Sequence, residues 1–190
     1  MIKMNEELEK AVKILREGKT LLYPTDTIWG LGCDVRCEPA VHRINEIKKR
    51  PKDKSYIVLI AEIGQLYDYV KKVPEIAWDI VDFAENPLTV VYPGGKGVAY
   101  GITAEDGSIA IRLVRDEFCS KLIKKLGRAI VSTSANISGD KTPENFTGVN
   151  PDILKAVDYV VNWRQEDKKI SRPSTIMKIE LDGEIKFIRK

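Results

Sequence analysis

The chain has 190 residues, of which 43% are apolar and 31% charged, so it can bury a core yet holds no run of about 18 apolar residues that would span a membrane. Three cysteines and one histidine give too few ligands for a zinc site or a disulfide framework, and we predict no protein-bound metal. A net charge of +3 permits phosphate binding without requiring it. We expect one domain over residues 1–190, in the cytoplasm because the amino terminus lacks the apolar segment of a signal peptide, with no membrane partner.

The chain begins with a predicted helix. Asn5 is its expected N-cap, Leu8, Val12 and Leu15 recur at helical spacing, and Gly18 is placed to end it. Helices and strands then alternate, which predicts a mixed α/β domain. The expected strands are 20–23, 55–61, 88–93, 108–114, 128–135, 158–162, 174–181 and 184–190; the expected helices begin near 39, 74 and 116, and loops cover 138–150 and 162–173. The last of these helices has Asp116 as its candidate N-cap and Gly127 as its stop.

The last two strands predict a hairpin around an Asp-Gly dipeptide. For a connection over residues 182–184, the parity of apolar residues pairs Ile179 with Phe187 and places Arg189 opposite Met177. A two-residue turn would shift Arg189 by one position. Arg189 is then expected close to Ser174.

Two glycine-rich stretches resemble nucleotide motifs but fail on spacing. Gly30 and Gly32 begin a GxGxxG pattern, yet Val35 occupies the third glycine position. Gly97 stands where a Walker A motif needs serine or threonine. We interpret the second stretch as an ordinary turn.

Two polar segments are candidates for binding. The basic run "KKRPKDK" around Pro51 is either a solvated helix end or a clamp for a polyphosphate. In "IVSTSANISG" a buried strand ends in hydroxyl and amide side chains, from Ser132 to Ser138. Strand ends in α/β sheets often bind ligands, although the same residues also form caps and turns.

Arg112 lies inside an otherwise apolar strand, "SIAIRLV". A charge there is costly unless it is paired, so it either forms a buried ion pair or faces a pocket that holds an anion. We favour the pocket. A serine-hydrolase triad with His42 is disfavoured, because the chain has no G-x-S-x-G elbow.

Taken together, "YPTDTIWGLGCD", "KKRPKDK", "SIAIR", "STSANISG" and "PSTI" resemble the YrdC family of threonylcarbamoyl-adenylate synthases over nearly the whole chain. The resemblance implies a single-domain YrdC-like α/β fold, in which a twisted mixed sheet is flanked by helices and carries an open, basic, concave cavity. It also implies a nucleotidyltransferase that joins L-threonine, bicarbonate and ATP into threonylcarbamoyl-AMP and pyrophosphate.

The implied product serves the N6-threonylcarbamoyladenosine modification of tRNA. The implied partners are therefore a downstream threonylcarbamoyl-transfer enzyme and tRNA or double-stranded RNA. Magnesium is expected to accompany ATP, because the ion bridges phosphate oxygens and keeps several waters.

The resemblance also assigns site residues by their place in the matching motifs. Lys48 and Arg50 would stabilise charge on pyrophosphate during adenylation, and Arg112 would pair with a carboxylate of threonine or of its carbamate. The implied threonine contacts are Thr27, Arg112, Ser134 and Ser174, and the implied ATP contacts are Arg50, Lys54, Ser108, Asn136 and Arg189.

Two alternatives stay open. One is an RNA-binding module without catalysis, which the modest net charge makes weaker. The other is a carbamoyl-transfer domain like those in hydrogenase-maturation proteins, which share the fold.

Overall fold

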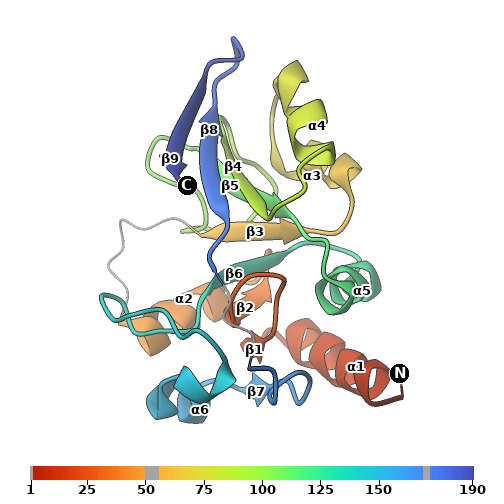
Figure 1. Cartoon of the computed structure of the whole chain (residues 1–190), viewed down its shortest axis with the longest axis vertical. Coiled ribbons are helices and arrows are strands. Elements are labelled where there is room, and N and C mark those ends of the chain that lie inside the picture. The colour runs from red at the N-terminus through yellow and green to blue at the C-terminus, as the bar shows by residue number, and fades with distance from the viewer. Residues whose placement is uncertain (1, 50–55, 169–171) are drawn as a thin grey trace.

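A computed structural model (Figure 1) describes residues 2–49, 56–168 and 172–190. The predicted site residues Arg50 and Lys54 and the predicted helix exit at Pro51 lie outside these ranges. Within them, no helix is long and apolar enough to cross a membrane.

A mixed sheet runs through the described part of the chain. Its strands follow the order β7-β1-β2-β6-β3-β5-β4-β8-β9. Most neighbouring strands are antiparallel, whereas β1 and β7, β3 and β5, and β4 and β8 are parallel. The strands are β1 (Leu21–Tyr23), β2 (Gly30–Asp34), β3 (Ile57–Ile60), β4 (Leu88–Tyr92), β5 (Ile109–Leu113), β6 (Ile130–Ser134), β7 (Tyr159–Val160), β8 (Thr175–Ile179) and β9 (Ile185–Arg189).

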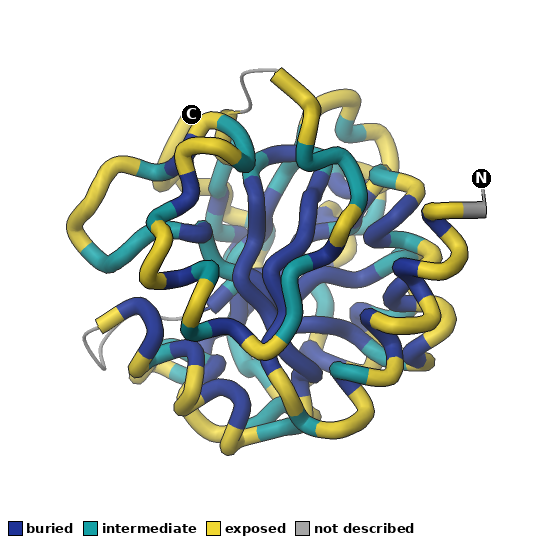
Figure 2. The backbone as a smooth tube through the Cα atoms, turned by 90° about the horizontal axis from the view of Figure 1, so that it is seen from below, coloured by how far each residue is buried: buried dark blue, intermediate teal, exposed yellow. Residues whose placement is uncertain are grey.

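Helices cover both faces of the sheet, and the most deeply buried backbone runs between them (Figure 2). Successive strand residues point to opposite faces, so each strand contributes to two apolar clusters. Helices α1 and α5 pack with Leu59 and Ile130 on one face, and α2, α3, α4 and α6 pack with Val58 and Val131 on the other. The helices are α1 (Ile2–Arg16), α2 (Glu38–Lys48), α3 (Leu66–Tyr69), α4 (Glu75–Asp82), α5 (Glu117–Leu126) and α6 (Pro151–Ala156), with short 3₁₀ helices at Ile63–Gln65 and Phe146–Gly148.

The structure confirms the expected α/β alternation and differs at the start of α1. The helix begins at Ile2, so Asn5 lies inside it and the predicted N-cap is wrong. The reason is the buried side chain of Met4, which lies one helical turn before Leu8 in the same cluster and extends the apolar face of the helix. At the other end, Gly18 has a φ of 71°, as a residue that follows a helix often does.

The register of the C-terminal hairpin also differs from the prediction. Ile179 pairs with Ile185 and Met177 with Phe187, and a bulge then places Arg189 opposite Ile176. The predicted pairs of Ile179 with Phe187 and of Met177 with Arg189 are therefore wrong. The connection is displaced by one residue from the predicted turn. Glu180 N–H donates to the carbonyl of Glu184, which leaves residues 181–183 between the strands instead of 182–184.

A buried carboxylate ties α1 to the segment that contains β7. Glu7 accepts hydrogen bonds from Lys10 Nζ (2.8 Å), the Tyr159 hydroxyl (2.7 Å) and the Asn162 backbone N–H (2.7 Å). Burial by itself raises the pKa of Glu7, but these hydrogen bonds outweigh it and hold the pKa below its ordinary value of 4.5.

We predict that Glu7→Gln lowers the free energy of unfolding at pH 7 by about 1–3 kcal/mol, because an amide cannot accept from all three donors. Glu6→Gln, one residue earlier and exposed, should change it little. Urea unfolding measures both values.

The effect of Glu7→Gln should depend on pH. A carboxyl whose pKa is lower in the folded state stabilises the fold fully above its unfolded pKa near 4.5 and loses this contribution as the pH falls through the folded value. The difference between wild type and variant should therefore shrink below about pH 4. A constant difference down to pH 2 would contradict this assignment.

Candidate active site

The cavity lies on the sheet face that α1 and α5 cover only in part. Cross-strand pairs place Gly30 of β2 opposite Ser134 of β6, and Ile57 of β3 beside Ala110 of β5. This row of small side chains continues the face on which Leu59 packs against α5, and it leaves a cavity of about 340 Å³. The lining residues are Thr25, Thr27, Ile28, Gly30, Tyr56, Ile57, Val91, Ala110, Arg112, Ser132, Thr133, Ser134, Thr142, Pro173, Ser174, Ile176, Ile188 and Arg189.

Arg112 supplies a buried cation to this cavity. Its Nη1 donates to Thr27 Oγ1 (2.9 Å), and its Nη2 lies 3.1 Å from a carboxylate oxygen of Asp26. The side chains of Arg112 and Asp26 are 5% and 12% exposed, so water screens the pair only weakly. The Nε of Arg112 is buried and has no hydrogen-bond partner in the described residues. Arg112 therefore has a buried ion pair and also lines a pocket, whereas the anion in that pocket stays a prediction.

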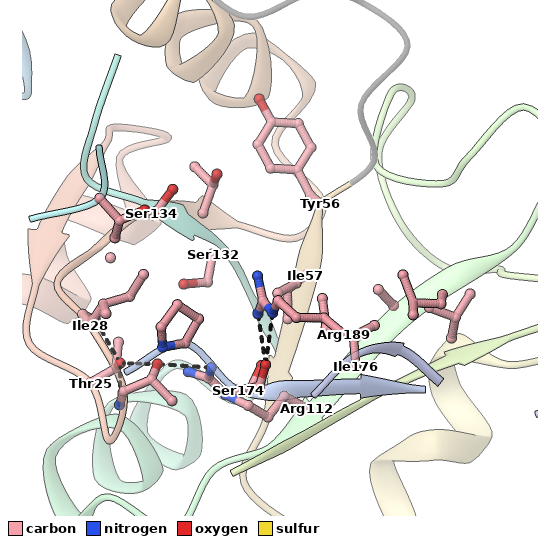
Figure 3. Close-up of a pocket in the computed structure, with 18 residues that line it drawn as sticks. Thr25, Ile28, Tyr56, Ile57, Arg112, Ser132, Ser134, Ser174, Ile176 and Arg189 are labelled. Atoms are coloured by element: carbon pink, nitrogen blue, oxygen red, sulfur yellow. Dashed lines mark hydrogen bonds between the residues drawn. The ribbon is translucent and has the colours of Figure 1, made fainter. Parts of the chain in front are cut away.

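The turn between β1 and β2 holds the threonines that face the cavity. Thr25 Oγ1 donates to the carbonyl of Ile28 (2.7 Å) and accepts from the backbone N–H of Thr27 (3.0 Å). The hydroxyls of Thr25 and Thr27 are 3.0 Å apart. Figure 3 shows these contacts beside Arg112. The turn is thus held by its own side chains, and it presents hydroxyl groups next to a guanidinium.

The entry to β8 forms the opposite wall. The hydroxyl of Ser174 lies 2.8 Å from that of Thr89, and the carbonyl of Ser174 accepts from Nε (3.0 Å) and Nη2 (2.8 Å) of Arg189 (Figure 3). The predicted proximity of Arg189 to Ser174 is confirmed. Burial and the neighbouring charge of Arg112 lower the pKa of Arg189, which marks a second cation near the first.

The end of β6 forms a third wall, with Ser132, Thr133 and Ser134 along the cavity. Lys48 lies behind this wall and is not among the lining residues. Its ammonium donates to the backbone carbonyls of Ser134 and Asn136.

Two further predicted residues lie outside the cavity. Ser108 is on the same face of the chain as Ala110 and Arg112, but its backbone N–H and side chain hydrogen-bond to Asp106. The amide nitrogen of Asn136 donates to the carbonyls of Ile137 and Asp140. The amide oxygen of Asn136 is buried without a partner in the described residues, and the roles of Ser108 and Asn136 stay predictions.

The structure therefore brings together five of the predicted residues, namely Thr27, Arg112, Ser134, Ser174 and Arg189. It also adds Thr25, Tyr56 and Thr142 to the lining. Tyr56 gave no sequence signal, because an aromatic residue at the start of a strand usually belongs to the core. Its hydroxyl instead donates to Asn45 Oδ1 (2.6 Å) at the last turn of α2.

The described residues contain no group of three or more histidine, cysteine, aspartate or glutamate side chains that could hold a metal ion.

Comparison with known proteins identifies a family model and several named relatives that match this chain. Residues 13–190 match the family model Sua5_yciO_yrdC, which carries the description "Telomere recombination". A protein of Xanthomonas euvesicatoria named threonylcarbamoyl-AMP synthase is 32% identical over 90% of this chain and 91% of its own length. A protein of Pseudoalteromonas translucida with the same name is 33% identical over 92% and 94%.

Solved structures with a similar fold include members of the same family. P. abyssi Sua5 complexed with L-threonine is 32% identical, with a TM-score of 0.80 over 90% of this chain. The chain spans about half of that protein, 50% of its length. E. coli YciO has a TM-score of 0.83 over 96% of this chain, and at 22% identity it shows the fold alone.

Strand β2, which contributes Gly30 to the cavity lining, also contains a glycine that has no room for a side chain. A Cβ on Gly32 would overlap the carbonyl oxygen of Val131 and lie 2.9 Å from Cε1 of Tyr23, which is fully buried. We predict that Gly32→Ala lowers the free energy of unfolding by about 1–3 kcal/mol through overpacking. Chemical denaturation measures this value.

Gly64→Ala is the matched control, because nothing lies within 4 Å of the added Cβ at that exposed site. Equal unfolding free energies for the two variants would show that the space beside Gly32 is not limiting.

Proposed function

Because this chain belongs to the Sua5/YciO/YrdC family, we propose that it is a threonylcarbamoyl-AMP synthase, which forms threonylcarbamoyl-AMP and pyrophosphate from L-threonine, bicarbonate and ATP. One observation carries the proposal. The buried guanidinium of Arg112, whose Nε has no partner among the described residues, lines a cavity of about 340 Å³ together with Thr27, Ser134 and Ser174. A cation surrounded by short hydroxyl groups suits a small hydroxylated amino acid with a carboxylate.

The threonine half of the reaction would take place on this guanidinium. Arg112 binds the carboxylate and keeps Asp26 as its internal counter-ion, so the charge stays paired when the cavity is empty. The threonine amine attacks the carbon of bicarbonate, water leaves, and an N-carboxylate forms. The serine and threonine hydroxyls orient the substrate, so catalysis here consists of positioning.

The nucleotide half would involve Arg189 and the segment between α2 and β3. An oxygen of the N-carboxylate attacks the α-phosphorus of ATP, and the bond to pyrophosphate breaks. Arg189 lies beside the cavity, and Tyr56, the first described residue after that segment, lines it. These positions support Arg50 and Lys54 as phosphate ligands that stabilise the charge moving onto pyrophosphate.

Magnesium and the wider partners belong to the same proposal. Magnesium would enter with ATP, and this rests on the chemistry of the triphosphate, whose oxygens the ion bridges. The reactive acyl adenylate would pass to a threonylcarbamoyl-transfer enzyme that acts on tRNA.

The direct test is pyrophosphate release by the purified chain. We expect release that requires ATP, L-threonine and bicarbonate together, with threonylcarbamoyl-AMP detected by mass spectrometry. Omission of any one substrate should abolish it. If ATP stays intact under these conditions while tRNA binds tightly, the chain is an RNA-binding module and the synthase proposal is wrong.

Arg112→Lys tests the carboxylate site. Lysine keeps the positive charge but lacks the planar guanidinium, whose N–H groups can bind both oxygens of a carboxylate. We expect the KM for threonine to rise about 10- to 100-fold, the equivalent of one charged hydrogen bond, while the KM for ATP changes less.

Arg128→Lys is the control, because Arg128 forms a part-buried ion pair with Asp34 away from the cavity. Steady-state kinetics with varied threonine measures both variants. An unchanged KM in Arg112→Lys would remove Arg112 from the threonine site.

A further inference from the structure

Lys48 is the last residue of α2, and its side chain is buried at 2% exposure. A lysine at the end of a helix usually extends into solvent and complements the helix dipole. Burial of an ammonium group costs free energy unless acceptors surround it. The acceptors around Lys48 therefore indicate what the residue does.

Two acceptors in the described part of the chain belong to the end of β6 and the loop that follows it. Nζ of Lys48 donates to the carbonyl of Ser134 (2.5 Å) and to that of Asn136 (2.6 Å). The backbone N–H of Ser138 donates to the carbonyl of Lys48 (2.8 Å). Lys48 thus hydrogen-bonds to backbone groups of three alternate residues of the segment 134–138, namely Ser134, Asn136 and Ser138.

The position of Lys48 is itself fixed. Lys49 closes α2 in the left-handed region, with a φ of 49°, and its N–H bonds to the carbonyls of Asn45 and Glu46. The side chain of Asn45 accepts from the hydroxyl of Tyr56, which lines the cavity. The last turn of α2 therefore connects to two cavity walls, at Tyr56 and at Ser134.

We propose that Lys48 is a positioning residue that acts on the reaction through the loop 134–138. This inference rests on the proposed function. The ammonium points at two backbone carbonyls behind the cavity wall, and it sets the backbone direction from which the hydroxyl of Ser134 and the amide of Asn136 extend. Phosphate binding then falls to other cations, among them Arg189, which lines the cavity. The phosphate role that sequence similarity gives to Lys48 is thereby replaced by control of the loop.

The test is the affinity for threonine in the absence of nucleotide. Lys48→Met keeps the length of the side chain and removes the donor, so we expect the threonine Kd, measured by calorimetry, to rise at least about tenfold. Turnover should fall by about 100-fold, as for a misplacement near 1 Å. Lys155→Met is the matched control, an exposed lysine in the last turn of α6, and should leave both values unchanged.

Lys48→Arg is a second variant that keeps the charge in case the methionine variant does not fold. Arginine is larger than the buried space left by lysine, so we expect it to shift the two carbonyls and weaken threonine binding. A direct phosphate contact would instead be largely kept by arginine. Unchanged threonine affinity in either folded variant, with weaker nucleotide binding, would overturn the proposal.

Amide hydrogen exchange separates this inference from the proposed function. We expect faster exchange across residues 134–138 in Lys48→Met than in wild type, and no change in Lys155→Met. This holds even if the wild-type chain releases no pyrophosphate, in which case the proposed function fails and the loop role of Lys48 stands. Unchanged exchange in Lys48→Met would show that Lys48 does not hold the loop.

Discussion

The buried guanidinium of Arg112 is the constraint around which the site is arranged. Its charge sits in the middle of a sheet, where solvation is poor, so the chain must supply a counter-charge and hydrogen-bond acceptors. Asp26 and Thr27 meet this need from the turn between β1 and β2. Hydrogen bonds of the Thr25 hydroxyl stabilise that turn. The requirement to stabilise one cation thus fixes a turn 85 residues earlier in the chain.

Small side chains keep the space above this cation open. Gly30, Ala110 and the serines of β6 lie on the face where larger apolar residues would otherwise fill the sheet. On the same face, further along the strands, Leu59 and Ile130 are covered by α1 and α5. The boundary between cavity and core is therefore set by side-chain size along each strand.

The elements were predictable where the local pattern and the tertiary environment agree. The N-cap Asp116 and Gly127 bound α5 as expected, because both act within one helical turn. Strand β2 was not predicted, since Gly30 and Gly32 have low strand propensity and only pairing with β1 and β6 stabilises it. Helix α6, which follows the polar loop from residue 138, was missed because it has only six residues.

The sequence predicted which residues form the site better than it predicted where their side chains point. Motif positions predicted Thr27, Arg112 and Ser174, and all three line the cavity. For Arg112 the physical reason is alternation along β5, which decides the face of the sheet on which a side chain lies. The orientation of the Lys48 side chain was not predictable, because its partner is the carbonyl of Ser134, 86 residues later in the chain. A run of basic residues carries no information about such a distant contact. The hairpin register failed because the sequence does not fix the position of the turn, and the connection lies one residue earlier than predicted. The bulge between Ile176 and Met177, which arises from pairing geometry, then decides the partner of Arg189.

The strand order has a consequence for how the molecule folds. The cavity lining extends from Thr25 to Arg189, and the central neighbours β2, β6, β3 and β5 are far apart in the chain. Non-local pairing of this kind carries a large loop-closure entropy before any contact forms, which slows folding. A partly folded chain with helices but without the β6 pairings would hold Arg112 beside water and lack the walls around it. The cavity is therefore complete only once these distant strands have paired.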